Sequence, residues 1–317
     1  MKSVARKVRS PFKNVLLATN FSASSEWSLR TAFRLCQMGS GQLLILHIRK
    51  EALRSGDGKD ADAENARLKD EALATLKEMS DRAKKAGIDC RTIADVGLPA
   101  AKILETIETE KIDLAILGTS EPRGSKRLVF GPTAEVVMRL AQCPIMTVGP
   151  VAADLIKTNA SKGPVVFATD FHSVTREAIQ VAVSYCRNTG LQLHCLHVLP
   201  RSLQSSEGDR ALPEILTSAL RHLAATTAEG IDLPVCCVTF GSEISNAIVD
   251  YIRGQRASLI FLGVRRSSLV ASDDPLPIVY RIITEAPCPV VTIVCETEDE
   301  MPLARLAESG LSPLRLM

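Results

Sequence analysis

Residues 111–149 have the sequence KIDLAILGTSEPRGSKRLVFGPTAEVVMRLAQCPIMTVG, which predicts a strand, a loop and a helix in that order. The apolar run 112–117 stops at Gly118, a polar and basic loop follows, and Gly131-Pro132-Thr133 opens a segment with helical spacing. A helix start offers unpaired backbone N–H groups and the positive end of the helix dipole. Glycine lets an anion approach the backbone closely. The stretch therefore predicts a phosphate site in outline.

The same order of features returns in the second half of the chain. Cys143-Pro144 matches Cys288-Pro289 at a shift of 145 residues, and Gly118 matches Gly263 at the same shift. Earlier in each half, two further pairs match at a shift of 150 residues: Asn20 with Asp170, and His47 with His197. Shared offsets this long predict a duplicated domain, with a change of loop length between the copies.

Length and composition agree with two soluble globular domains. The chain has 317 residues, of which 46% are hydrophobic and 23% charged. A formal net charge of +2 gives no reason to expect nucleic acid or an acidic membrane as a partner. The basic N-terminal residues 1–10 lack an apolar signal region, and no apolar run approaches the roughly 18 residues of a membrane-spanning helix. We expect a cytoplasmic protein.

The nine cysteines predict buried thiols in a reducing compartment, because they are odd in number, form no C-x-x-C pair and lie mostly in apolar runs. Cys236-Cys237 is a poor redox pair, since adjacent strand residues point to opposite faces. His194 and His197 are three residues apart on a strand, so they too face opposite sides and do not predict a metal site.

Short apolar runs alternate with helical segments, which predicts an α/β fold of two tandem, doubly wound, parallel five-stranded sheets. The expected domains are residues 1–150 and 163–296, with a tail at 297–317. The expected strands are 14–19, 43–48, 88–96, 112–117 and 144–148 in the first domain, and 164–169, 191–198, 231–240, 259–262 and 290–294 in the second. The expected helices include 62–86, 100–109, 173–189, 212–228 and 243–253.

Parallel sheets of this kind bind ligands beyond the carboxyl ends of their strands, where the strand order reverses. The candidate residues for a ligand are therefore those that end or follow strands one, two and four and those that start the next helix. They are Ala18, Thr19, Asn20, Ile48, Gly118, Gly124, Gly131 and Thr133.

Several motifs together resemble the universal stress protein family. They are the T-[ND]-F turn after strand one, the L-G-T and G-P-T segments around the loop, and the closing C-P-[IV] strand. The resemblance covers about 14–149 and again 164–294. It implies a tandem member with a Rossmann-like, adenine nucleotide alpha hydrolase-like fold, and it implies that the fifth strands of the two copies meet as in an internal pseudo-dimer.

Members of this family that bind ATP carry a glycine after strand four, another three positions later, and a Gly-Ser or Gly-Thr after nine more residues. Gly118 and Gly131 match the first and third places, thirteen residues apart. Glu121 takes the second place, with the nearest glycine at Gly124, and Pro132 takes the Ser/Thr place. A carboxylate repels phosphate and proline removes one N–H donor, although proline suits the first helical turn.

The two copies depart from the family pattern in opposite ways. The family pattern has Asp where the first copy has Asn20, which can still donate and accept hydrogen bonds. The second copy keeps Asp170 and Gly263 as remnants of a site, but thirteen residues after Gly263 the chain has Leu276-Pro277. The second copy therefore predicts a structural domain, and the first an ATP site.

The predicted function is a stress-response regulator that senses ATP and acts by conformational change or through an unidentified protein partner. The chain is expected to form an internal pseudo-dimer, with a homodimer of chains as a further expectation. An interaction or dimerisation module that binds no nucleotide remains an alternative. An adenylyl transferase is a second one, but no catalytic residues are predicted and no G-x-x-x-x-G-K-[ST], G-x-S-x-G or H-E-x-x-H motif occurs. We expect at most slow ATP hydrolysis.

Overall fold

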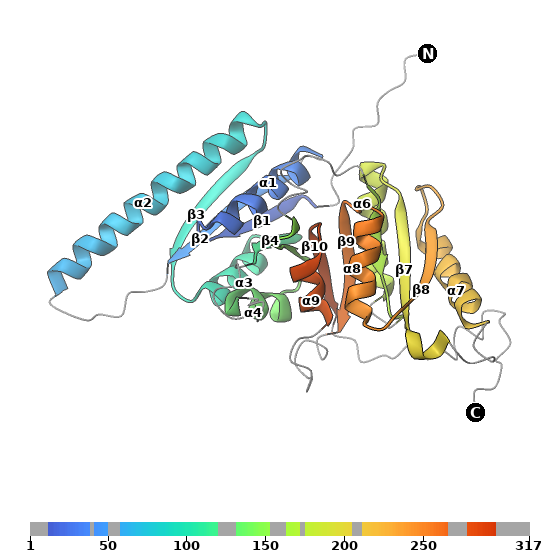
Figure 1. Ribbon diagram of the computed structural model, residues 1–317. Helices are drawn as coiled ribbons and strands as arrows, with labels where there is room; N and C mark the ends of the chain where they lie inside the picture. The colour runs from blue at the N-terminus through green and yellow to red at the C-terminus, as the bar shows by residue number, and fades with distance from the viewer. Residues whose placement is uncertain are drawn as a thin grey trace, which may run out of the picture. The chain divides into compact units, whose positions relative to one another are not determined.

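The structure is a computed structural model that describes residues 12–38, 41–49, 58–119, 131–152, 163–171, 175–204, 211–265 and 278–295. The described residues fall into two compact units. The first lies within Met1–Ser161 together with Ile283–Thr292, and the second within Lys162–Ile282 together with Ile293–Met317. Each unit is an α/β layer structure (Figure 1).

The first unit is built on a sheet whose strand order is β3-β2-β1-β4-β5, with all of these strands parallel. The strands are β1 (Asn14–Thr19), β2 (Gln42–Arg49), β3 (Cys90–Val96), β4 (Leu114–Gly118) and β5 (Ile145–Val148). Strand β10 (Val290–Cys295) joins β5 antiparallel, with Val290 opposite Thr147.

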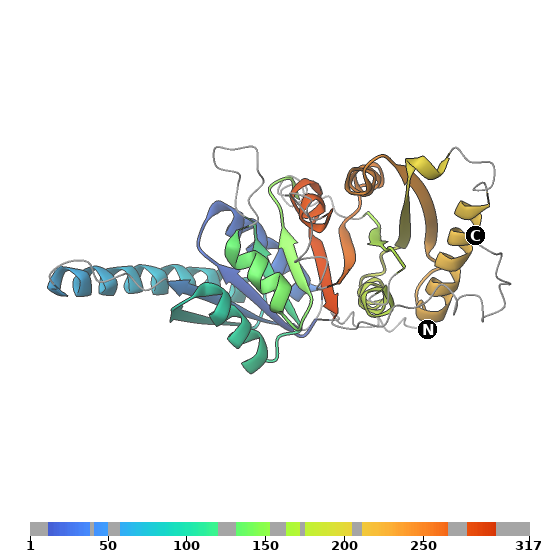
Figure 2. The ribbon, with the colours of Figure 1, turned by 90° about the horizontal axis from the view of Figure 1, so that it is seen from below.

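Two pairs of helices cover this sheet. The helices are α1 (Ala23–Gln37), α2 (Gly58–Lys85), α3 (Pro99–Thr109) and α4 (Pro132–Leu140). An ion pair joins α1 to α2, and α3 packs against α4. Right-handed crossovers in this strand order place the two pairs on opposite faces. Figure 2 shows the first unit from below, with α2 continuing beyond the ends of β2 and β3.

The second unit repeats the design with the strand order β9-β6-β7-β8, again all parallel. Its strands are β6 (Val165–Ala168), β7 (Leu193–Pro200), β8 (Val235–Gly241) and β9 (Leu259–Arg265). Its helices are α6 (Thr175–Thr189), a short 3-10 turn η1 (Arg201–Gln204), α7 (Leu212–Thr227) and α8 (Ile244–Gly254), and α9 (Ile278–Glu285) leads toward β10. Helix α6 packs against α7, while α8 packs on β7 and β8.

The duplication is visible in the backbone as well as in the sequence. Lys111, after α3, has φ 51°, and Arg256, after α8, has φ 50°, which is the left-handed region. In both places the next amide bonds back to the helix: Ile112 N–H to Ile107 O, and Ala257 N–H to Ile252 O, each at 3.0 Å. The two helices thus end in the same motif, 145 residues apart.

Several strands begin later than the sequence predicts, among them β4 and β7 by two residues each, and for β3 and β8 the backbone gives the reason. Strand β3 begins at Cys90 rather than at 88, because the Ile88 N–H closes the end of α2 by bonding to Ala83 O (3.0 Å) and cannot enter the sheet. Strand β8 begins at Val235 rather than at 231, since Pro234 has no N–H to give to the ladder. Helix α2 begins earlier than expected, at Gly58.

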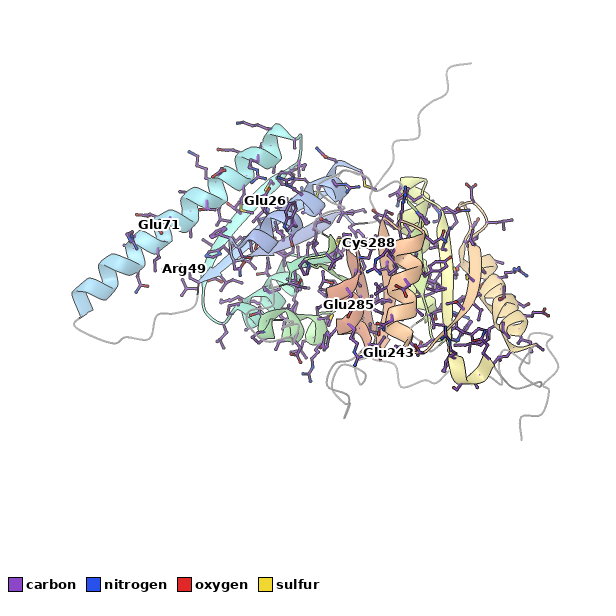
Figure 3. All side chains as sticks on the ribbon, in the orientation of Figure 1. Glu26, Arg49, Glu71, Glu243, Glu285 and Cys288 are labelled. Carbon is purple, nitrogen blue, oxygen red and sulfur yellow. The ribbon has the colours of Figure 1, made fainter. Side chains whose placement is uncertain are left out.

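The core of each unit lies between its sheet and its helices. Leu16, Leu17 and Ile116 are fully buried in the first unit, and Phe167 and Phe261 in the second. Figure 3 shows the side chains on both units. Within the described part of the chain, no helix combines the length and apolar character needed to cross a membrane.

Candidate functional site

The turn after β1 is held by a set of hydrogen bonds around Thr19. The Phe21 N–H donates to Thr19 Oγ1 (3.0 Å), and His47 Nδ1 lies 2.9 Å from Thr19 O. A carbonyl oxygen only accepts, so Nδ1 carries the proton and, in the neutral ring, Nε2 is the acceptor. The Phe21 ring stacks on His47, with centroids 4.0 Å apart and an interplanar angle of 21°. These contacts join the carboxyl ends of β1 and β2.

Phe21 adopts φ 60°, a backbone conformation that residues other than glycine rarely take. The stacking on His47 and the bond to Thr19 hold it there. Burial is the main influence on the pKa of His47 and lowers it, whereas the hydrogen bond to Thr19 O raises it. The imidazole is therefore neutral at physiological pH.

Asn20 stands at the mouth of the sheet with an exposed side chain. Its Oδ1 accepts a hydrogen bond from Ser25 Oγ (2.9 Å) and another from Ser22 N–H (3.1 Å). Its Nδ2 has no hydrogen bond to the described part of the chain, so it remains a donor. The Asn20 carbonyl oxygen thus joins the turn after β1 to the start of α1.

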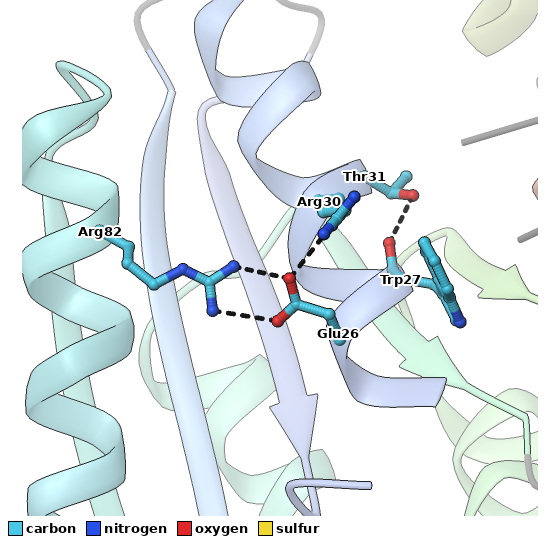
Figure 4. A network of polar contacts seen from close by, with 5 residues as sticks. All are labelled: Glu26, Trp27, Arg30, Thr31 and Arg82. Atoms are coloured by element: carbon cyan, nitrogen blue, oxygen red, sulfur yellow. Dashed lines mark hydrogen bonds and ion pairs between the residues drawn. The ribbon is translucent and has the colours of Figure 1, made fainter. Parts of the chain in front are cut away.

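Glu26, in the first turn of α1, joins this helix to α2 through Arg82 (Figure 4). Arg82 of α2 donates Nη2–H to Glu26 Oε1 (2.6 Å) and Nη1–H to Oε2 (3.0 Å), and Arg30 donates Nε–H to Oε1 (3.1 Å). The hydrogen bonds from Arg82 are the main reason that the pKa of Glu26 is lowered. This network joins α2 to the helix whose start carries Ser25.

The second unit contains the same turn at a shift of 150 residues. The Phe171 N–H donates to Thr169 Oγ1 (2.9 Å), and His197 Nδ1 lies 2.7 Å from Thr169 O. Phe171 has φ 63°, and its ring lies 4.8 Å from that of His197. Burial is again the main cause of a lowered pKa at the histidine. Asp170, exposed, takes the place of Asn20.

The start of α4 is open for an anion in its described part. Gly131 is the N-cap in an extended conformation (φ −60°, ψ 143°) and has no side-chain cap. Pro132 follows without an N–H, and the Glu135 N–H already bonds to Gly131 O (3.0 Å). The first turn therefore leaves the N–H groups of Thr133 and Ala134 without helical acceptors. Because β4 and β5 are adjacent and parallel, α4 starts at the carboxyl edge of the sheet.

The register places most candidate residues at this edge. Ala18 pairs with both Leu46 and Leu117, so Ala18, Thr19, Ile48 and Gly118 end neighbouring strands at similar height. The Thr119 hydroxyl turns away and donates to Val148 O (3.3 Å). Two loop positions considered for the motif, Glu121 and Gly124, lie outside the described residues.

The second unit differs from the first at the glycine that matches Gly118, which is Gly263. Strand β4 ends at Gly118, whereas β9 continues through Gly263 to Arg265. The chain therefore does not leave the sheet at Gly263 as it does at Gly118. Leu276 and Pro277 lie outside the described residues, and Gly263 and Asp170 remain only as the matching positions.

A cavity of about 270 Å³ lies at another place in the second unit, between η1, the end of β8 and the first turns of α8. Glu243 and Asp250 line it, but Glu243 pairs with Arg281 and Asp250 with Arg253, both at 3.1 Å. Figure 3 marks Glu243 in the second unit. This cavity contains none of the candidate residues.

Two residues of the site were missed in the sequence. His47 and Phe21 hold the turn, and the signal was the shift of 150 residues that both share with His197 and Phe171. His194 faces the other side of β7, where its Nδ1 lies 3.0 Å from the Tyr251 hydroxyl. The two histidines of this strand thus have different partners.

Comparison with known proteins agrees with the duplicated fold. The model of the universal stress protein family matches residues 11–149 and again 163–293. A universal stress protein of Methanocaldococcus jannaschii is 25% identical over 150 residues, covering 47% of this chain and 88% of the relative. A universal stress protein of Bacillus subtilis is 26% identical over 146 residues, covering 43% of this chain and 99% of the relative.

Among solved structures, a universal stress protein from Archaeoglobus fulgidus is similar over both units. It covers 89% of this chain and 98% of its own, with a TM-score of 0.70 at 21% identity, which supports the fold. The architecture is thus Rossmann-like, of the adenine nucleotide alpha hydrolase type, and the chain belongs to the universal stress protein family, of which it carries two copies in tandem.

Proposed function

We propose that the first unit binds ATP or a closely related adenine nucleotide at the carboxyl edge of β1, β2 and β4. The observation that carries the proposal is the start of α4, where Gly131 caps the helix without a side chain and two N–H groups of the first turn have no acceptor among the described residues of the helix. Phosphate oxygens are the acceptors that such a helix start favours. The residues present therefore fit the phosphate end of a nucleotide.

The strand ends would hold the nucleoside end. Ala18 and Ile48 are half-buried and would give apolar contact to the base. The Asn20 Nδ2 group would donate to a ribose or adenine acceptor. His47 would act through Thr19 and Phe21, by keeping this turn in its left-handed conformation. Gly124 would be part of the phosphate loop.

Binding without turnover fits the described part of this edge. Asn20 stands where the second unit has Asp170, and the other candidate residues are glycine, alanine, threonine and isoleucine. None of these side chains is a general base for water, and the neutral imidazole of His47 is engaged with Thr19 O and the Phe21 ring. We expect at most slow hydrolysis, and the protein would act as a cytoplasmic stress-response regulator whose nucleotide changes its conformation or its contact with a protein partner. A homodimer of chains belongs to the same proposal.

A second candidate function is an interaction or dimerisation module that binds no nucleotide. It is favoured by Asn20 Oδ1, which is already engaged by Ser25 and Ser22, and by the missing N–H of Pro132. In the second unit, the strand that continues through Gly263 favours a structural role.

Calorimetric titration of the full chain with ATP, ADP and AMP tests the proposal. Gly131→Val should weaken ATP binding at least about tenfold, or roughly 1.4 kcal/mol, because the side chain would stand where the phosphate approaches. Its φ of −60° suits valine, so the fold should persist. Gly254→Val is the matched control, since Gly254 has open space around its Cα and lies at the end of α8. No saturable binding to the wild-type chain would support the interaction module instead.

A further inference from the structure

Two cysteines face each other across neighbouring strands of the second unit. Cys195 of β7 and Cys236 of β8 are direct partners in the parallel register of these strands. Neighbouring strands lie about 4.8 Å apart, and a disulfide joins Cα atoms about 4.4–6.8 Å apart. The two thiols shift each other's pKa, which indicates that they lie close together. The register therefore places the two Cα atoms within the span of a disulfide.

The two thiols differ in access to solvent. Strand β8 is the edge strand in the order β9-β6-β7-β8 of this unit, as Figure 1 shows. Cys236 is partly exposed, whereas Cys195 is 0% exposed. A small solute can thus reach Cys236 from the edge, and Cys195 lies behind it.

The pKa values of the two thiols are shifted in opposite directions. The neighbouring Cys195 thiol is the main cause that lowers the pKa of Cys236, burial acts against it, and the guanidinium of Arg221 on α7 lowers the pKa further. The neighbouring Cys236 thiol and burial raise the pKa of Cys195. Because the thiolate is the nucleophile, Cys236 is the reactive member and Cys195 its neutral neighbour.

The neighbouring cysteines offer a contrast. Cys237 lies on the other face of β8, where its thiol contacts the Tyr251 hydroxyl of α8 and burial raises its pKa. Cys186 of α6 lies near Cys195 but is only 1% exposed, and burial raises its pKa to about 12. Neither combines access with thiolate character.

We propose that Cys236 and Cys195 are a thiol pair that reacts with hydroperoxides and closes to a disulfide between β7 and β8. The Cys236 thiolate attacks the peroxide O–O bond, takes one oxygen and becomes a sulfenic acid, and the other oxygen leaves as water or an alcohol after protonation. The Cys195 sulfur then displaces hydroxide from the sulfenic sulfur. Its own proton leaves with that hydroxide as water. Two thiols lose two electrons in total, and one peroxide gains them.

The disulfide would tie the edge strand to its neighbour. Strand β8 leads through Gly241 directly to α8, whose Tyr251 contacts His194 and Cys237. Oxidation would therefore hold this edge more rigidly, and the second unit would have a redox function independent of any nucleotide in the first.

The test treats the reduced full chain with hydrogen peroxide, blocks the remaining thiols with N-ethylmaleimide and maps the peptides by mass spectrometry without reduction. We expect a crosslinked peptide pair that joins Cys195 to Cys236, lighter by two hydrogens than its parts and separated by dithiothreitol. The chain should remain of single-chain mass on a denaturing gel. Cys237→Ser should keep this product, and Cys236→Ser and Cys195→Ala should lose it.

Arg221→Gln tests the role of charge. It should slow the loss of the Cys236 thiol several-fold, because each unit of pKa changes the thiolate fraction about tenfold. A crosslink of Cys236 to Cys237, of Cys195 to Cys186 or between chains would overturn the proposal. Conversion of Cys236 to sulfinic acid while Cys195 still reacts with N-ethylmaleimide would overturn it as well.

Discussion

His47 donates its Nδ1–H to the carbonyl oxygen of Thr19 (2.9 Å) and so joins the carboxyl ends of β1 and β2 beside the proposed nucleotide site. His197 makes the same bond to Thr169 (2.7 Å) in the second unit. The turn is thus a shared structural device, while the residues around it differ between the units. This difference allows matched pairs of variants.

Replacement of His47 by alanine should affect stability and binding together. His47→Ala removes one hydrogen bond and one ring contact, which costs about 1–2 kcal/mol of unfolding free energy. It should also weaken ATP binding, since the turn that carries Asn20 loses its support. His197→Ala should cost a similar free energy and leave ATP affinity unchanged. Urea unfolding and calorimetric titration measure the two effects, and equal losses of affinity in both variants would contradict the assignment.

Stability should fall as the pH is lowered through the histidine range. Burial lowers the pKa of His47 and His197 in the folded chain below the ordinary value of 6.5. The unfolded chain then binds more protons, so stability is fully present above about pH 6.5 and is lost as the pH falls through the folded pKa values. The double variant His47→Gln and His197→Gln should show a smaller slope in urea unfolding between pH 7 and 5.5 than the wild type. A steeper slope would contradict this explanation.

The ion pair between Glu26 and Arg82 should contribute modestly. The Glu26 side chain is 34% exposed and the Arg82 side chain is 39% exposed, so solvent screens their interaction. Arg82→Ala should therefore cost about 0.5–1 kcal/mol, the upper part of the range for exposed pairs, since its contact with Glu26 is bidentate. Arg67→Ala, in a more exposed pair with Glu71, is the control and should cost less. Because the pKa of Glu26 is lowered, its contribution should be present above about pH 4.5 and be lost as the pH falls through the folded value.

Glycine should stabilise the chain at two exposed helix ends. Lys111 and Arg256 have φ near +50°, which costs other residues about 1 kcal/mol. Lys111→Gly and Arg256→Gly should each raise the unfolding free energy by roughly 0.5–1 kcal/mol after the greater chain entropy of glycine is counted. Lys111→Ala, which keeps the unfavourable conformation, should not. Thermal unfolding of the three variants distinguishes these outcomes, and a destabilising Lys111→Gly would show that the side chain matters more than the backbone.

Much of the fold follows from patterns within the sequence. The apolar runs gave the strands because each central strand is covered on both faces, and the repeated Cys-Pro and Gly positions gave the duplication. The start of α4 at Pro132 and of α3 at Pro99 followed from proline in the first turn. Strand ends were less accurate, because Ile88 belongs to the cap of α2, a backbone bond that no residue type announces.

The contacts between strands could not be predicted in the same way. The bond of His47 to Thr19 and the pairing of Cys195 with Cys236 both depend on the register of separate strands. Adjacency in the sequence pairs Cys236 only with Cys237, which lies on the opposite face of β8, and does not indicate a partner on β7. The sequence predicts that this strand ends at Leu262, because Gly263 interrupts the apolar run, whereas β9 continues to Arg265.

The stoichiometry of ATP binding to the full chain tests the central claim most directly. Equilibrium dialysis against ATP in excess over the chain should give one bound nucleotide per chain, and Gly131→Val should reduce it while Gly254→Val does not. No bound nucleotide, or binding that persists in full when Gly131 is replaced, would contradict the account.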